Sequence, residues 1–229
     1  MQKTVTLLTV LLVLAGGIAH ANLITNGGFE STTPVIPSGG FLNFIPGATG
    51  LTGWTVVGNS GTDVSVVNTN FVQECCSFPA EEGNNWLDLT GDGSNNDTEG
   101  VQQTIATTVG DNYGVSFYVG NVYDANGIFG TTSTVDVFAN STSLVPFTNS
   151  CTTCTTKLTW QLFTTSFTAT STSTTLKFLN GDPANDNSNG LDNIVVLDNG
   201  PVGTVPEPAS LALAGIGVAY LALRRRVTL

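Results

Sequence analysis

The chain has 229 residues and a formal net charge of −11, with six Lys and Arg residues against 17 Asp and Glu residues. In its long central part, residues 22–200, the only basic side chains are Lys157 and Lys177, which excludes the basic clusters that bind nucleic acid or anionic membranes. The only histidine, His20, lies before this body, which excludes Ser-His-Asp triads, Cys-His pairs and His-bound zinc within it.

The first 21 residues have the pattern of a cleavable secretory signal. Lys3 precedes an apolar run from Val5 to Ile18, and Ala19-His20-Ala21 supplies the small residues of a signal-peptidase site. We expect signal peptidase to release a mature chain that begins at Asn22. A retained N-terminal anchor is the alternative, but the apolar run is short for a membrane span.

The body, residues 22–200, predicts an all-β fold and a single jelly-roll β-sandwich. Short apolar or alternating runs recur between clusters of Gly, Asn, Asp and Pro, and no long amphipathic helix or internal repeat is present. Between Tyr113 and Val119, for example, Val115, Phe117 and Val119 fall on one face of a strand. The predicted strands are Asp63 to Asn68, Trp86 to Leu89, Val101 to Thr107, Tyr113 to Val119, Thr134 to Phe138, Leu158 to Phe167, Thr175 to Leu179 and Leu191 to Leu197.

Five short motifs follow one another in the order seen in one family of jelly rolls. They are Asn22 to Glu30, Gly53-Trp54-Thr55-Val56, Gly100-Val101-Gln102-Gln103-Thr104, Tyr113 to Gly120 and Gly190-Leu191-Asp192-Asn193-Ile194. In this order the body resembles galactose-binding-like and related carbohydrate-binding jelly rolls. The resemblance implies a fold more strongly than a ligand, because one fold serves many functions.

The same resemblance implies a structural calcium ion held by Glu30 near the first strand and Asp192 in the last strand. A hydrogen-bonded junction without metal is an equally good interpretation of these two residues. Two further acidic loops, Asp92 to Asp97 and Asp182 to Asp186, lack the full calcium-loop pattern and are interpreted as solvated turns.

Aromatic side chains are the usual platforms for sugar rings. Trp54 and Trp86 lie inside strand patterns, so we expect both to be buried. The loop from Asn121 to Gly130 is the better candidate for an exposed ligand site. Its expected ligand-binding residues are Tyr123, Asp124, Asn126 and Phe129.

A glycoside hydrolase would need two carboxylates at a fixed separation in a cleft. The acidic residues that could serve are Asp88, Glu81, Glu82 and Glu99, but the sequence does not identify a catalytic pair among them. We therefore expect a protein that is not an enzyme.

Four cysteines lie in two local pairs, Cys75 with Cys76 and Cys151 with Cys154. In an exported chain they are disulfide candidates, although the sequence does not fix their connectivity. The Cys-x-x-Cys spacing favours a structural loop staple over a redox centre, since no basic group stands nearby to stabilise a thiolate.

The C-terminus combines three features in a fixed order. Pro206-Glu207-Pro208 precedes an uncharged stretch from Ala209 to Leu223, and Arg224-Arg225-Arg226 follows. As a helix this stretch would span about 22 Å, short of the roughly 30 Å hydrocarbon core, and the arginines favour a cytoplasmic end. By composition alone the tail is a weak membrane anchor.

In these residues the tail resembles the PEP-CTERM sorting signal of Gram-negative bacteria. The resemblance implies transient anchoring in the inner membrane, recognition by an exosortase, removal of the tail, and release or attachment of the body at the cell surface. We therefore expect an exported surface or extracellular matrix protein that contacts exopolysaccharide. A purely structural, glycosylated surface protein with no specific ligand is the alternative.

Overall fold

A computed structural model describes residues 20–92, 99–182 and 188–203. The body from His20 to Val202 forms one compact unit. All regular elements in the described ranges are β-strands, in agreement with the all-β prediction. No helix among these residues is long and apolar enough to cross a membrane.

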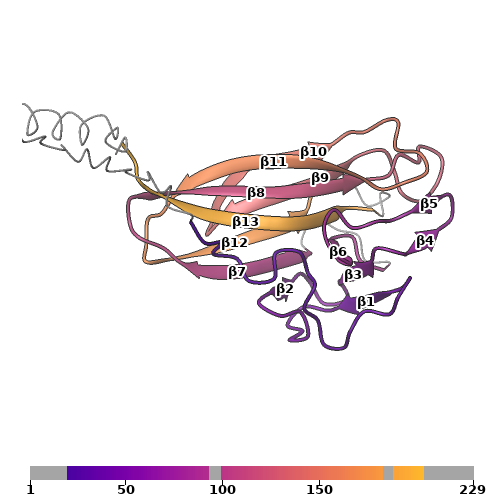
Figure 1. Ribbon diagram of the computed structural model, residues 1–229, viewed down its shortest axis with the longest axis horizontal. Helices are drawn as coiled ribbons and strands as arrows, with labels where there is room; N and C mark the ends of the chain where they lie inside the picture. The colour runs from indigo at the N-terminus through magenta and orange to yellow at the C-terminus, as the bar shows by residue number, and fades with distance from the viewer. Residues whose placement is uncertain (1–19, 93–98, 183–187, 204–229) are drawn as a thin grey trace, which may run out of the picture. The chain divides into compact units, whose positions relative to one another are not determined.

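Two antiparallel sheets form a β-sandwich of the jelly-roll type (Figure 1). The six-stranded sheet has the order β1-β3-β6-β13-β8-β11, and the five-stranded sheet has the order β10-β9-β12-β7-β2. A small hairpin of β4 and β5 stands apart from both. The strands are β1 Phe41–Phe44, β2 Thr55–Val57, β3 Val64–Asn68, β4 Val72–Gln73, β5 Cys76–Ser77, β6 Asn85–Asp88, β7 Gly100–Ala106, β8 Asp111–Asn121, β9 Ser133–Ala139, β10 Thr142–Asn149, β11 Thr159–Thr168, β12 Ser173–Asn180 and β13 Gly190–Pro201.

The main core lies between the two sheets and follows from the alternation of side chains along each strand. In β8, Val115, Phe117 and Val119 are buried as predicted. The ring of Phe117 meets Phe178 of β12 at 5.4 Å and Phe147 of β10 at 5.2 Å, both edge-on. Each such side chain contributes about 1.5–3 kcal/mol by burial, so these contacts hold the sheets together.

A second apolar cluster covers the opposite, outer face of the six-stranded sheet. In β6, Leu87 enters the main core while Trp86 points the other way, into the second cluster. This outer cluster is roofed by the β4–β5 hairpin and by the loops that follow β8 and β10. Its buried members are Val67, Cys76, Phe78, Trp86, Val122, Phe129 and Leu158, with Phe41, Phe71, Ala80 and Trp160 packed at its margin.

Trp160 of β11 packs against a glycine pair that leaves room for its indole. Gly120 of β8 pairs with Gly190 of β13, and a Cβ atom on them would come within 2.8 Å and 2.9 Å of the indole ring. The indole N–H donates to the carbonyl oxygen of Pro79 at 2.9 Å, and the ring meets Trp86 edge-on at 5.8 Å. The outer cluster is therefore tied to the sheet and to the segment before β6.

All eight strands predicted from the sequence are present, with ends that differ by a few residues. The strand β2 lies in the segment that the jelly-roll resemblance placed in a strand. The strands β1, β4, β5 and β10 were not predicted. The sequence pattern does not reveal β10, because Pro146 interrupts it and its pairing with β9 shifts between Ser143 and Pro146. An edge strand tolerates both features. The expected burial of Trp54 and Trp86 is confirmed.

The terminal predictions fall on residues that the structure does not describe. The predicted signal peptide occupies residues 1–21, of which only the last two are described. The predicted transmembrane-like helix, residues 209–223, and the Pro-Glu-Pro and Arg motifs around it lie outside the described ranges.

Candidate functional site

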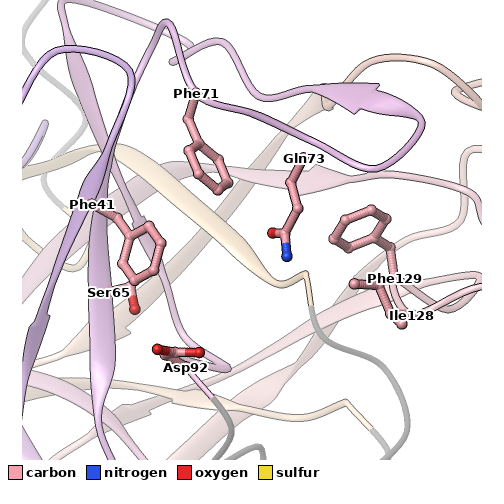
Figure 2. A pocket seen from close by; sticks show the side chains of 8 residues that line it. Phe41, Ser65, Phe71, Gln73, Asp92, Ile128 and Phe129 are labelled. Atoms are coloured by element: carbon pink, nitrogen blue, oxygen red, sulfur yellow. The ribbon is translucent and has the colours of Figure 1, made fainter.

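A pocket of about 210 Å³ opens on the outer side of the six-stranded sheet, next to the outer apolar cluster (Figure 2). We call it the outer pocket. β1 and β3 supply its inner side, the β4–β5 hairpin and the residues before it supply one wall, and the loop after β8 supplies another. Its described lining residues are Phe41, Ser65, Phe71, Gln73, Gly91, Asp92, Ile128 and Phe129.

The side-chain amide of Asn43 links the polar residues Ser65 and Asp92 on one side of the outer pocket. Buried Ser65 donates its hydroxyl to Oδ1 of Asn43 at 2.8 Å, and Nδ2 of Asn43 lies 3.4 Å from Oδ2 of Asp92. Asp92 is itself fixed because its backbone N–H donates to Oδ1 of Asp63 at 2.8 Å. The turn requires Gly91, whose φ is +61° and where a Cβ atom would lie only 2.0 Å from that same oxygen. The chain thus holds one exposed carboxylate at the rim.

Aromatic rings form the other side of the outer pocket. Phe41 and Phe71 meet edge-on at 5.5 Å and are both half-buried. Behind them Phe78 contacts Phe71 at 5.6 Å and Phe129 at 5.1 Å, so the walls share one aromatic support. Figure 2 shows the side chains of Phe41, Phe71 and Phe129 arranged around the same space as Gln73. The pocket therefore combines apolar ring surfaces with an amide and a carboxylate.

Asp88 lies beside the inner side of the outer pocket, since it pairs with Ser65 across β3 and β6. Its Oδ1 accepts hydrogen bonds from the N–H and hydroxyl of Thr90 at 3.1 Å and 2.8 Å and from the N–H of Asn189 at 3.2 Å. Burial raises the pKa of Asp88 to about 7, while these hydrogen bonds oppose the shift. Near neutral pH this carboxyl group is partly protonated and less repulsive toward its acidic surroundings.

The four residues predicted to bind ligand are only partly brought to the outer pocket. Phe129 lines it, but our expectation that this ring is exposed is wrong: only 3% of its area is accessible, because it packs on Phe78. Tyr123 and Asp124 are half-buried and Asn126 is exposed, and none of the three is among the described lining residues. A ligand role for these three stays a prediction.

Sequence reasoning missed most of the outer pocket. Phe41, Phe71 and Ile128 carry no sequence signal that separates a pocket wall from a core position. Asp92 opens a loop that we interpreted as a solvated turn, and only its place beside β1 and β3 gives it a pocket to face. Residues from five separate segments meet here, and only the tertiary fold brings them together.

Glu30 and Asp192, the predicted calcium pair, both hold the loop before β6. Oε1 of Glu30 accepts the N–H groups of Asn84 and Asn85 at 2.7 Å and 2.9 Å. Oδ2 of Asp192 accepts the N–H of Glu81 at 2.9 Å, in the same loop. These hydrogen bonds agree with the interpretation of the two residues as a hydrogen-bonded junction.

The same geometry bears on calcium. Carboxylate oxygens are the ligand type that calcium prefers, but the oxygens of Glu30 and Asp192 named above already accept hydrogen bonds from backbone N–H groups. In the described part of the chain no three Asp, Glu, His or Cys residues are grouped to hold a metal. Calcium at Glu30 and Asp192 therefore stays a prediction.

Burial dominates the electrostatics at Asp192. It is fully buried and its pKa is raised to about 8, against the opposing effect of the N–H groups of Asn193, Glu82 and Glu81. Nearby, the negative charge of Glu81 raises the pKa of the Tyr118 hydroxyl. Glu81 also accepts a hydrogen bond from Nδ2 of Asn193 at 3.0 Å. The junction is acidic, and it favours a neutral Asp192.

The carboxylates considered for glycoside hydrolysis are not among the described lining residues of the outer pocket. Glu81 belongs to the junction just described, Glu82 is exposed in the same loop and Glu99 is fully buried. Among the described lining residues of the outer pocket, Asp92 is the one carboxylate.

The cysteines lie in the hairpin that walls the outer pocket and in the connection from β10 to β11. Cys75 and Cys76 form a disulfide at the tip of the β4–β5 hairpin, where Cys76 pairs with Gln73. Cys151 and Cys154 are free thiols in the connection from β10 to β11.

Comparison with known families identifies the body and the tail separately. Residues 22–196 match the family described as protein of unknown function, DUF642. The chain belongs to the DUF642 family. In this DUF642 protein, residues 204–226 also match the PEP-CTERM protein-sorting motif, which makes it an exosortase-sorted surface protein. No curated protein matches it significantly.

Solved structures share the fold of this DUF642 protein at low identity. The Stig cyclase Fisc from Fischerella sp. TAU, in complex with a pyrrolidinylidene indole, is 19% identical with a TM-score of 0.52, covering 80% of this chain and 100% of that one. A Fischerella sp. TAU cyclase in complex with 4-(1H-indol-3-yl)butan-2-one is also 19% identical, with a TM-score of 0.53 and coverage of 78% and 96%. The CBM22-1 xylan-binding domain of Paenibacillus barcinonensis Xyn10C is 14% identical with a TM-score of 0.42, covering 69% and 92%. At these identities the cyclases establish the shared sandwich and nothing about activity.

Proposed function

We propose that this protein is exported, sorted to the cell surface by an exosortase, and there binds extracellular polysaccharide in the outer pocket without chemical turnover. The tail motif supports the destination. The pocket supports the binding, and its mixture of half-buried rings with exposed polar groups is the observation that carries the proposal.

The chemistry of the outer pocket matches the surface of a sugar ring. A pyranose has C–H faces that pack on aromatic rings and hydroxyl groups around its edge that need hydrogen-bond partners. Phe41 and Phe71 offer apolar faces, while the amide of Gln73 and the carboxylate of Asp92 offer an N–H donor and acceptor oxygens. Both polar side chains are exposed and can exchange water for hydroxyl groups.

The size of the outer pocket limits what it can hold. Its volume, about 210 Å³, is below the roughly 300–1,000 Å³ of pockets that enclose drug-sized ligands. We therefore propose that one ring, or the end of a chain, enters while the rest of the polysaccharide stays in solvent. A single site of this kind binds weakly, and many copies at a surface bind by avidity.

Truncation of the polar rim is expected to weaken polysaccharide binding with little effect on folding. Gln73→Ala and Asp92→Ala each remove hydrogen-bonding groups of an exposed side chain, and each should raise the dissociation constant roughly tenfold. Affinity electrophoresis in gels that contain exopolysaccharide from the producing cells measures this. Leu162→Ala is the matched control, because Leu162 is exposed but does not line the pocket.

Two competing functions give different results in the same laboratory test. A structural surface protein with no specific ligand would show no retention by any polysaccharide, with or without calcium. A glycoside hydrolase would release reducing sugar from one of them, and its rate would fall when a carboxylate is replaced. Retention without sugar release is the result that the proposal requires.

Tail removal is expected to depend on the sorting motif. In protein isolated from the cell surface, mass spectrometry should find a C-terminus upstream of the arginine cluster at residues 224–226. Replacing Glu207 and Pro208 together by alanine should leave the tail attached and the protein in the inner membrane. A wild-type surface protein that still ends at Leu229 would contradict exosortase processing.

A further inference from the structure

The turn formed by residues 151–154 is built into the support of the outer pocket. The carbonyl oxygen of Cys154 accepts the N–H of Tyr123 at 3.0 Å, and that of Cys151 accepts Nδ2 of Asn121 at 3.2 Å. The same amide lies 3.4 Å from the carbonyl oxygen of Thr131. The turn therefore contacts the start of the loop that carries Ile128 and Phe129, and the amide of Asn121 links it to the end of that loop at Thr131.

The second wall rests on the same connection. The backbone N–H of Ser77 in β5 donates to the carbonyl oxygen of Thr156 at 3.1 Å, and the N–H of Leu158 donates to that of Ser77 at 2.9 Å. Sγ of Cys76 lies 3.4 Å from the carbonyl oxygen of Thr155. The segment from Cys151 to Leu158 thus joins the hairpin to the loop across the back of the outer pocket.

Within this segment the Cys154 thiol donates to the carbonyl oxygen of Cys151 at 2.9 Å, and a hydrogen bond also joins the two thiols. Cys154 is 5% exposed and Cys151 is half-buried, so one sulfur is sheltered and the other can be reached from solvent. Burial acts against ionisation of both, but hydrogen bonds from Cys154 and Thr153 lower the pKa of the Cys151 thiol, whereas burial raises the pKa of Cys154 to about 11. Cys151 is therefore the thiol that attacks first.

We propose that Cys151 and Cys154 form a second disulfide in the exported protein, beside the disulfide of Cys75 and Cys76. The oxidant is a disulfide of the oxidising compartment outside the cytoplasm. The Cys151 thiolate attacks it, forms a mixed disulfide and releases one carrier thiolate. The deprotonated thiol of Cys154 then attacks the sulfur of Cys151 and releases the second. Two thiol protons and two electrons leave the protein, and the carrier disulfide becomes a dithiol.

This pairing joins two thiols that already lie within one turn, whereas a cross-pairing would join separate segments. Joining Cys76 to Cys154 would have to break the disulfide at the hairpin tip and move the buried Cys154 away from Cys151. In the local pairing, each disulfide joins two cysteines of the same short segment. One disulfide then fixes the hairpin wall, and the other fixes the connection that supports both walls.

Disulfide mapping of the mature surface protein tests the inference without any reference to polysaccharide. The protein is isolated without reductant, denatured in N-ethylmaleimide and digested with chymotrypsin, because no Lys or Arg lies between the two cysteine pairs. We expect no maleimide on any cysteine and one internal disulfide in each peptide. Maleimide on Cys151 or Cys154, or a peptide that links residues 75–76 to 151–154, would overturn the proposal.

Thermal unfolding gives an independent reading. The double variant Cys151→Ser/Cys154→Ser should melt about 4–7 °C below the wild type under oxidising conditions, as expected for a short closed loop in a domain of this size. Cys75→Ser/Cys76→Ser retains only the second pair, so a reducing agent should lower its melting temperature by a similar amount. If the melting temperature of this variant is the same with and without the reducing agent, the second disulfide is contradicted.

Discussion

Trp86→Ala is expected to lower the free energy of unfolding by about 3–5 kcal/mol, the usual cost of emptying a large aromatic site. Trp86 is 1% exposed, and its indole N–H donates to the carbonyl oxygen of Phe78 at 3.0 Å. It also stacks with Phe78 at 6.3 Å and meets Trp160 edge-on at 5.8 Å. For a domain of this size the melting temperature should fall by roughly 10 °C or more, as measured by circular dichroism.

Two further variants separate packing from the loss of a surface group. Trp86→Phe keeps a ring but loses the N–H donor and part of the volume, so it should fall between the wild type and Trp86→Ala. Leu162→Ala alters an exposed side chain of β11 and should change stability by no more than about 0.5 kcal/mol. If Trp86→Ala has the same melting temperature as Leu162→Ala, the outer cluster does not act as a second core.

The second large effect is a loss of stability as the pH rises, to which Asp192 contributes most and Asp88, whose pKa burial raises to about 7, also contributes. The pKa of Asp192 is raised from 3.8 to about 8 on folding, so between these values the folded protein binds more protons than the unfolded chain. The resulting stabilisation is complete below about pH 4 and is lost as the pH rises through 8. A pKa difference of one is equivalent to about 1.4 kcal/mol, so the three pH units between 5 and 8 amount to about 4 kcal/mol. We therefore expect the melting temperature in a chelator to fall by roughly 8–16 °C between pH 5 and pH 9.

Asp192→Asn isolates this contribution, because the amide stays neutral at every pH. The variant should lose clearly less stability than the wild type over the same pH range. Asp198→Asn, on the same strand β13, controls for the removal of one negative charge. If the wild type and Asp192→Asn show parallel pH profiles, Asp192 is not the group responsible.

Calcium acts on the same carboxyl group and can be read in the same experiment. A bound cation favours the ionised carboxylate, so calcium would raise the melting temperature of the wild type most at pH 8 and above. Asp192→Asn and Glu30→Gln should both reduce that gain. A wild-type melting temperature that is unmoved by calcium and by chelator counts against the predicted metal.

The sandwich could be predicted because its information is local. The alternation in Tyr113 to Val119 and the apolar run in Leu191 to Leu197 each report one strand, and each strand is present in the structure. The missed strand β10 lacks such a pattern, since Pro146 and a shift in pairing leave most of its side chains exposed. Its place in the sheet depends on β9, which its own sequence does not encode.

The outer pocket could not be predicted for the opposite reason. Phe129 has the same residue type and loop position whether it lies open to solvent or packs on Phe78. What decides is the β4–β5 hairpin, which brings Phe71 and Gln73 over the outer face of the sheet. The sequence indicates that the loop from Asn121 to Gly130 is a candidate ligand site. Only the fold shows that its Ile128 and Phe129 form a wall of the outer pocket.

Polysaccharide binding in the outer pocket is tested most directly by a binding isotherm of the mature wild-type protein with exopolysaccharide from the producing cells, beside the double variant Gln73→Ala/Asp92→Ala. We predict saturable binding by the wild type and by Leu162→Ala. For the double variant we predict a dissociation constant that is at least about tenfold larger, at an unchanged melting temperature. Equal binding by the double variant and the wild type, or no binding by the wild type, would contradict a binding role for this pocket.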